Sequence, residues 1–184
     1  MRIISGVYGS RRLRAPDGTD TRPTADRVKE AMFSILGGVR ASDRVLDLYA
    51  GSGALALEAI SRGAERAVLV DQSKAACGVI AENIASLACG DRARLLNMSD
   101  TAALSLLSRE GARFSLIFLD PPYRMDAAPI MSVLLDEALL SPDGVIVVEH
   151  SDKTPPDPDD RLTLSLRRAY GDTALSFYRF REED

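Results

Sequence analysis

The chain has 184 residues, a net charge of −4, 46% hydrophobic residues and 27% charged residues, values that are ordinary for a soluble globular protein. They argue against a membrane protein, because no apolar run approaches the roughly 18–20 residues that a membrane span needs. The opening residues do not resemble a signal peptide. We therefore expect a single cytoplasmic domain, a monomer with no membrane partner, long enough to bury a sizeable core.

Basic residues are concentrated at the N-terminus. Residues 1–40 contain eight Lys or Arg and four Asp or Glu, whereas the rest of the chain contains fifteen and twenty-three. A basic end on an acidic body is typical of a segment that binds nucleic-acid phosphates. A charged terminus that is merely solvated is the alternative. The arginines of the first fourteen residues are Arg2, Arg11, Arg12 and Arg14.

The predicted elements begin with a small hairpin, residues 2–8 and 11–15 around Gly9-Ser10, and a helix at 25–36 that Gly37-Gly38 ends. From residue 44 onward short apolar strands alternate with helices, which indicates βαβ units and a parallel sheet. The predicted strands are 44–48, 66–70, 92–96, 114–119 and 145–149. The predicted helices are 54–62, 74–88, 101–109 and 129–139.

The end of the chain breaks this alternation. A proline-rich loop at 154–158 is followed by two predicted strands, 161–169 and 174–181, joined by the turn Tyr170-Gly171-Asp172-Thr173. A doubly wound, Rossmann-like α/β sheet that is mostly parallel and ends in an antiparallel hairpin is the arrangement of class I S-adenosylmethionine-dependent methyltransferases. The sequence thus predicts one domain, with a hairpin and helix extension at 1–40 and a catalytic core at 41–184.

A candidate cofactor turn follows the first strand of the core. The segment Asp47-Leu48-Tyr49-Ala50-Gly51-Ser52-Gly53 leads from a strand into a helix, where glycines let a ligand approach the backbone and N–H groups are unpaired. The third glycine of the dinucleotide fingerprint is replaced by Ala56, a residue that the fingerprint also tolerates. Asp47 suits the ammonium group of S-adenosylmethionine and would repel a pyrophosphate.

Carboxylates also follow the next two strands. Asp71, with Gln72 beside it, stands where a carboxylate can accept hydrogen bonds from both ribose hydroxyls. Asp100 is placed to meet the adenine amine, with Met98 and Ser99 near the ring. A helix-capping role is the alternative for Asp71 and for Asp100.

The tetrapeptide Asp120-Pro121-Pro122-Tyr123 follows the fourth strand of the core and is the candidate catalytic loop. The lone pair of an exocyclic amine on a nucleobase is delocalised into the ring. Asp120 and the Pro121 carbonyl can accept both amine hydrogens and aim the lone pair at a sulfonium methyl group. Pro121 and Pro122 hold the turn rigid, and Tyr123 offers a face for a flipped-out base.

With these motifs the chain resembles the bacterial small-subunit ribosomal RNA methyltransferases of the RsmD type. Arg2–Gly6 resembles the opening strand of that family, and Arg22–Thr24 with Asp26–Glu30 and Met32-Phe33 resembles its signature before the core. Three further segments match in order and spacing: Asp47–Gly53, Asp120–Tyr123 and Tyr170–Thr173. The resemblance implies methyl transfer from S-adenosyl-L-methionine to the N2 amine of a guanine in 16S ribosomal RNA, as naked RNA or in the 30S subunit. The residues expected to contact this RNA are Arg2, Arg11, Arg12, Arg14, Arg22, Thr24 and Arg27.

Other polar residues have less specific interpretations. We expect His150, the only histidine, to be a strand-end polar residue. Cys77 and Cys89 have no metal-ligand spacing, so we expect free thiols and no metal. Two other functions fit part of the pattern. A DNA adenine-N6 methyltransferase also uses Asp-Pro-Pro-Tyr, and a catalytically silent RNA-binding assembly factor could keep the fold.

Overall fold

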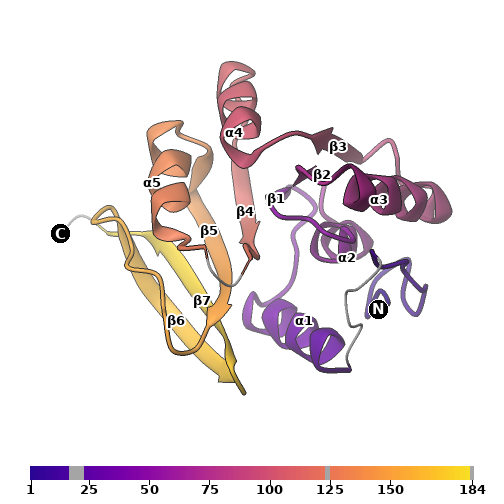
Figure 1. Cartoon of the computed structure of the whole chain (residues 1–184), viewed down its shortest axis with the longest axis horizontal. Helices are drawn as coiled ribbons and strands as arrows, with labels where there is room; N and C mark the ends of the chain where they lie inside the picture. The colour runs from indigo at the N-terminus through magenta and orange to yellow at the C-terminus, as the bar shows by residue number, and fades with distance from the viewer. Residues whose placement is uncertain (17–22, 123–124, 183–184) are drawn as a thin grey trace. The chain divides into compact units, whose positions relative to one another are not determined.

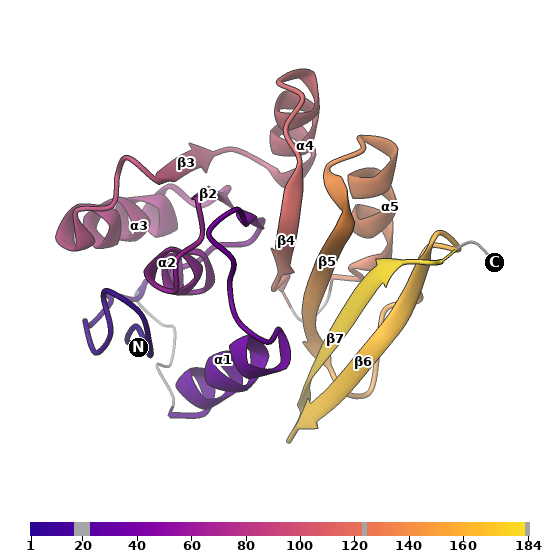
Figure 2. The same cartoon turned by 180° about the vertical axis from the view of Figure 1, so that it is seen from behind.

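The computed structural model describes residues 1–16, 23–122 and 125–182, and the chain divides into two compact units, Met1–Asp100 and Thr101–Asp184. Figures 1 and 2 show the elements of both units from opposite sides. No helix of the described chain is long and apolar enough to cross a membrane. The division into a 1–40 extension and a 41–184 core remains a prediction.

The first unit is built on three parallel strands in the order β3-β2-β1. Its elements are α1 (Pro23–Ile35), β1 (Arg44–Asp47), α2 (Ala54–Ser61), β2 (Arg66–Asp71), α3 (Lys74–Leu87) and β3 (Ala93–Asn97). The helix α2 packs on β1 and β2, and α3 packs on β2 and β3. Every residue of α2 except Leu55 is buried, as expected of a helix that is apolar on all sides.

The N-terminal segment lies against the end of α2 in place of a full hairpin. Arg2 and Arg12 form the one isolated bridge of this segment, and the predicted strand over 2–8 turns away after Ile4. The Val7 N–H donates to the carbonyl of Ser61 at 2.8 Å. Gly6 has a φ of +84°, and a Cβ there would lie 1.9 Å from the same carbonyl oxygen. The predicted strand length was therefore wrong, because this segment bonds to a helix end.

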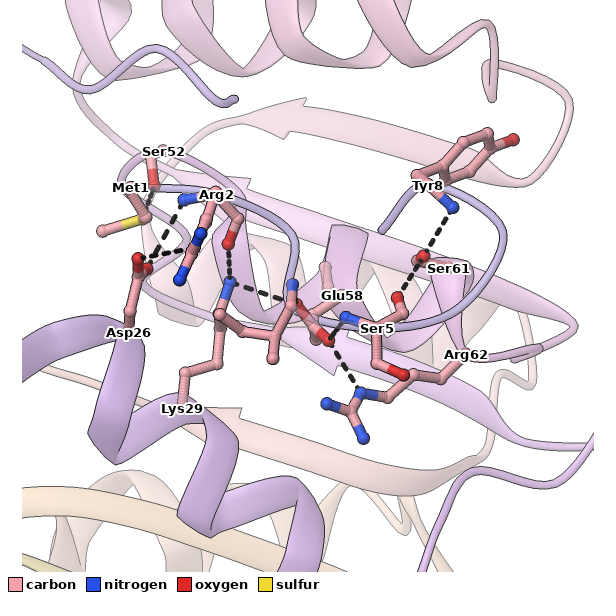
Figure 3. Close-up of polar contacts among 12 residues, drawn as sticks. Met1, Arg2, Ser5, Tyr8, Asp26, Lys29, Ser52, Glu58, Ser61 and Arg62 are labelled. Atoms are coloured by element: carbon pink, nitrogen blue, oxygen red, sulfur yellow. Dashed lines mark hydrogen bonds and ion pairs between the residues drawn. The ribbon is translucent and has the colours of Figure 1, made fainter. Parts of the chain in front are cut away.

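A buried ionic cluster holds this segment in place, as Figure 3 shows. Glu58 is fully buried, and its carboxylate accepts hydrogen bonds from the N–H groups of Ile4 and Ser5 at 2.7 and 3.0 Å. Lys29 Nζ lies 3.1 Å from Glu58 Oε2, and Arg62 Nε lies 2.7 Å from Oε1. Desolvation lowers the pKa of Lys29, and the Glu58 carboxylate partly offsets that effect. One carboxylate thus joins α1, α2 and the N-terminal segment.

The second unit contains four strands in the order β4-β5-β7-β6. Its elements are α4 (Asp100–Arg109), whose first residue closes the first unit, β4 (Phe114–Leu119), α5 (Ala128–Asp136), β5 (Leu140–Ser151), β6 (Leu162–Tyr170) and β7 (Thr173–Phe180). The pair β4 and β5 is parallel, whereas β5–β7 and β7–β6 are antiparallel. The predicted C-terminal hairpin is confirmed, with Tyr170 opposite Thr173.

The element prediction fails chiefly at β5, which begins at Leu140 and not at residue 145. Phe114 pairs with Leu140, but Leu116 pairs with Val145, so the register shifts between these two pairs. The shift accommodates Pro142, which has no N–H to donate to a ladder.

Candidate active site

The predicted cofactor turn joins β1 to α2 and is closed on its core side. Asp47 is buried, and its Oδ2 accepts a hydrogen bond from the Ala56 N–H at 3.1 Å. Gly53 has a φ of +77°, and a Cβ there would lie 2.9 Å from Leu69 Cδ2. A larger residue at position 53 would thus be strained and crowded at once. Asp47 and Gly53 fix the turn from within.

The other side of the turn is open. Gly51 has a φ of +56°, and no heavy atom of the described chain outside residues 50–52 lies within 4 Å of the position that its Cβ would occupy. Ser52 is buried, its hydroxyl donates to Met1 Sδ at 3.2 Å, and its carbonyl accepts from the Asn83 amide at 2.9 Å. A ligand can therefore approach the backbone at Gly51 while Ser52 anchors the turn.

Asp71 lies beside this turn at the end of β2. Its Oδ2 accepts from the Gly51 N–H at 2.9 Å, and its Oδ1 accepts from the Ser73 N–H at 2.8 Å. Asn97 at the end of β3 donates to the carbonyls of Asp71 and Gln72 at 3.0 and 3.2 Å. The carboxylate is thus preorganised and half exposed, which suits a group that accepts ribose hydroxyls.

Tyr49 and Asp100 meet although they stand 51 positions apart. The Tyr49 hydroxyl donates to Asp100 Oδ2 at 2.8 Å. Burial, followed by this hydrogen bond, raises the pKa of the Tyr49 hydroxyl far above its usual value, so the phenol stays protonated. Met98 and Ser99 are half-buried just before α4. The predicted cofactor residues therefore share the carboxyl-end edge of β1, β2 and β3 within one unit: Asp47, Tyr49, Ala50, Gly51, Ser52, Gly53, Asp71, Gln72, Met98, Ser99 and Asp100.

Most arginines of the basic N-terminus are held against the first unit. Arg2 Nε lies 3.6 Å from Asp26 Oδ2. Arg11 donates to the Ser86 carbonyl at 2.7 Å, and Arg14 pairs with Glu82 at 2.6 Å, so both lie along α3. Arg12 is exposed, and among the described residues its side chain has no ionic or hydrogen-bonding partner.

The residues at the start of α1 for which RNA contacts were predicted lie next to this basic segment. Arg27 is exposed and lines a cavity of about 380 Å³ together with Arg2, Asp26 and Glu30. Thr24 lies in the first turn of α1, whereas Arg22 lies outside the described residues. The RNA contacts assigned to these residues remain predictions.

The candidate catalytic loop directly follows β4 in the second unit. Leu119 pairs with Val148 in the parallel ladder, so Asp120 and Glu149 continue β4 and β5 at the same level. Protein atoms surround the Asp120 carboxyl group on most sides, although the residue is reached by solvent, and this desolvation raises its pKa to about 6. Burial and the nearby Asp120 charge raise the pKa of Glu149 to about 8.

These two carboxyl groups also lack internal partners. Within the described chain, the carboxyl group of neither Asp120 nor Glu149 forms a hydrogen bond or an ion pair. At pH 7 the two pKa values leave Asp120 ionised and Glu149 protonated, because two desolvated charges side by side repel each other. Both carboxyl groups can therefore accept hydrogen bonds from a bound ligand.

A cavity of about 550 Å³ adjoins the pair. Its walls are the two prolines of the catalytic loop, the end of β5 and the proline-rich loop after it, with Pro121, Pro122, Glu149, His150, Pro155 and Pro156 among the lining residues. This volume lies within the range of about 300–1,000 Å³ of small-ligand sites. Tyr123, the predicted stacking residue, lies outside the described residues.

The histidine and the two cysteines have structural surroundings that agree with the roles expected from the sequence. His150 lies in β5, with Nδ1 2.7 Å from the Ser151 carbonyl and Nε2 2.8 Å from Ser176 Oγ. Cys77 and Cys89 are free and buried, and desolvation raises the pKa of both thiols. No group of three or more His, Cys, Asp or Glu in the described chain is arranged to hold a metal.

Sequence reasoning missed three polar residues at these sites: Asn97, Glu58 and Glu149. Asn97 ends a strand beside Asp71, which is the pattern that drew attention to Asp71 itself. Glu149 could have been found in the same way, since it ends the predicted strand 145–149, which follows the strand before Asp120. Glu58 gave no signal, because an acid inside an apolar helix pattern reads as a solvent-facing residue.

The fold defines the chain as a Rossmann-like methyltransferase domain. The solved structure of yhhF from Escherichia coli has a TM-score of 0.85 and 34% identity, and the match covers 100% of this chain and 99% of that one. An RNA methyltransferase from Salinibacter ruber, solved with S-adenosyl-L-homocysteine, has a TM-score of 0.67 at 17% identity, covering 90% and 96% of the two chains. At that identity the likeness shows the fold. The predicted fold class is confirmed.

The family model described as "Conserved hypothetical protein 95" matches residues 1–179. The ribosomal RNA small subunit methyltransferase D of Escherichia coli (strain K12) is 38% identical over 81% of this chain and 74% of its own length. The chain therefore belongs to the RsmD family of ribosomal RNA methyltransferases, as the resemblance of its motifs predicted.

Proposed function

We propose that this chain is an S-adenosyl-L-methionine-dependent enzyme that methylates the exocyclic N2 amine of a guanine in 16S ribosomal RNA, in the assembled small subunit. One observation carries the proposal: Asp120 follows β4 directly before Pro121 and Pro122, which line a cavity of about 550 Å³, and its carboxyl group has no partner within the described chain. Membership of a family that includes ribosomal RNA methyltransferases supports the RNA as substrate.

The residues of the first unit fit the cofactor. The open face at Gly51 admits a ligand to the backbone, and Asp71 is already oriented by two N–H donors. Asp47, Gly51, Gly53 and Asp71 would hold the cofactor, with Tyr49 and Asp100 at the adenine end. When bound, S-adenosylmethionine supplies an electrophilic methyl group on a sulfonium centre.

The residues of the second unit prepare the amine. Asp120, ionised at pH 7, accepts one amine hydrogen, and the Pro121 carbonyl accepts the other. These two contacts draw the amine toward tetrahedral geometry and free its lone pair for a new bond to the methyl carbon. The sulfur–carbon bond breaks as that bond forms, and the surplus proton of the amine leaves to Asp120 or water. The fixed φ angles of Pro121 and Pro122 keep the carbonyl in place.

Labelled S-adenosylmethionine tests the proposal against its alternatives. The protein is incubated with naked 16S RNA, assembled 30S subunits or duplex DNA, and the labelled nucleoside is identified after digestion. We expect N2-methylguanosine from 30S subunits. Labelled N6-methyladenosine in DNA would identify a DNA adenine methyltransferase. RNA binding without any transfer would identify a catalytically silent assembly factor, and the proposal would fail.

A further inference from the structure

The unpartnered carboxyl group of Glu149 points to a role that the methyl transfer itself does not require. We infer that Glu149 is a specificity-determining residue, whose carboxylate accepts a hydrogen bond from guanine N1–H while Asp120 accepts one from the N2 amine. The inference rests on the proposed function, because it assigns the base that the same site selects.

The register of β4 and β5 brings the carboxyl groups of Asp120 and Glu149 close to each other. Leu119 and Val148 are partners in the parallel ladder of β4 and β5, and Asp120 and Glu149 are the next residues of the two strands. Neighbouring strands are about 4.8 Å apart, so the two side chains can address adjacent atoms of one base edge. Glu149 lines the cavity against which Pro121 and Pro122 lie.

The absence of internal donors defines the kind of ligand. Among the described residues neither carboxyl group meets an N–H, an O–H or a cation, so both can accept hydrogen bonds from a bound ligand. Guanine presents N1–H and the N2 amine side by side. Adenine and cytosine place a ring-nitrogen acceptor next to their amine, and that lone pair would face an ionised Glu149. When Glu149 is ionised, the two carboxylates therefore favour guanine over adenine and cytosine.

The protonation state of Glu149 determines which base its carboxyl group can recognise, so base selection should change with pH. Ionised, Glu149 accepts from guanine N1–H; protonated, it donates to a ring-nitrogen acceptor at the same position. The other titratable groups around this end of the cavity are Asp120 after β4, Asp126 before α5, His150 on β5 and Asp157 in the loop after β5. Burial and the Asp120 charge raise the pKa of Glu149 to about 8, so the change falls within a pH range that RNA tolerates.

The test compares guanosine with 2-aminopurine at the target position of the RNA substrate. 2-Aminopurine keeps the 2-amino group but has an acceptor at N1. We expect the wild-type ratio of kcat/KM for guanosine over 2-aminopurine to rise between pH 6.5 and 8.5. It should reach about tenfold to a hundredfold, the equivalent of one hydrogen bond to a charged group. In Glu149→Gln the ratio should be smaller and independent of pH, because the amide both donates and accepts and does not titrate.

Asp143→Asn is the control, since Asp143 is an exposed carboxylate of the same strand that does not line the cavity, and its replacement should leave the ratio and its pH dependence unchanged. Stabilisation of each variant by S-adenosylhomocysteine confirms that it is folded. A wild-type ratio that does not change with pH, or the same ratio in Glu149→Gln, would overturn the role of Glu149. Failure of the wild-type enzyme to methylate guanosine RNA would instead overturn the proposed function and this inference with it.

Discussion

The two units of the chain differ in how the acidic residues of their candidate sites are partnered. In the first unit Asp47, Glu58 and Asp71 all accept hydrogen bonds from backbone N–H groups. In the second unit Asp120 and Glu149 have no such partner within the described chain, and both have raised pKa values. The carboxylates of the first unit therefore hold the cofactor turn and the N-terminal segment in place, whereas Asp120 and Glu149 are available to a substrate.

Breaking the scaffold should give the largest effect. Glu58→Gln leaves Lys29 buried without its ionic partner, so we expect a loss of about 3–5 kcal/mol in the free energy of unfolding. Urea denaturation measures this loss. Glu65→Gln is the control, because Glu65 forms only an exposed pair with Arg66 and should cost less than about 1 kcal/mol. Equal losses in the two variants would contradict the structural role of Glu58.

Replacing Asp120 should lower activity and leave stability unchanged, whereas replacing Glu58 should lower stability. We expect Asp120→Ala to reduce methyl transfer by on the order of 10² or more, since a preorganised polar group next to the reacting atom is lost. Its stability should not fall, because no internal partner is left unpaired. Single-turnover rates and urea denaturation measure the two quantities, and binding of S-adenosylhomocysteine should stay within a few-fold of wild type. Near-normal turnover would refute the assigned role.

Asp71 sharpens the comparison, because it is both a scaffold residue and a candidate ligand. We expect Asp71→Ala to weaken S-adenosylmethionine binding by roughly 1.5–3 kcal/mol, the range for hydrogen bonds to a charged group. Calorimetry measures the affinity. S-adenosylhomocysteine should raise the melting temperature of the wild-type protein, whereas NAD and ATP should not. A rise with NAD would point to a dehydrogenase.

The raised pKa values of Asp120 and Glu149 predict that the stability of the protein depends on pH, an effect smaller than the preceding ones. Asp120 and Glu149 keep their protons in the folded protein up to about pH 6 and 8, whereas in the unfolded chain they lose them near pH 4. The stabilising contribution is therefore complete below pH 4 and is lost as pH rises through 6 to 8. Glu149→Gln should raise the melting temperature at pH 8.5 by about 2 °C or more over wild type, with no such gain at pH 5. A gain of equal size at both pH values would contradict the assignment.

The smallest expected effect concerns two arginines of the N-terminal segment, which differ, like the acids, in whether the described chain provides a partner. Arg14 is paired with Glu82, whereas Arg12 is exposed and has no partner in the described chain. If Arg12 binds a phosphate, Arg12→Ala should lower the slope of log affinity for RNA against log salt by roughly 0.7–0.9. Arg14→Ala should change it less. Filter binding over a salt series measures both slopes, and identical wild-type slopes in both variants would mean that this segment is only solvated.

A structural feature was predicted well when it depends on residues that are close in the sequence, and poorly when it depends on residues that are far apart. The strand Phe114–Leu119, the helix α2 and the turn around Gly51 were predicted almost to the residue, because hydrophobic period and glycine positions are local properties. The N-terminal hairpin was wrong in extent, because its backbone bonds to Ser61, more than fifty positions away. No local pattern signals a partner at that separation.

The sequence by itself determined the order of strands and helices, the cofactor turn and the Asp-Pro-Pro loop, since each lies in a short contiguous segment. Only the tertiary structure decided which side chains meet. It joined Tyr49 to Asp100, bound Glu58 to the N-terminal segment and set Glu149 level with Asp120. These contacts depend on strand register and helix packing, and a shift of one residue in β5 would turn Glu149 to the opposite face of the sheet.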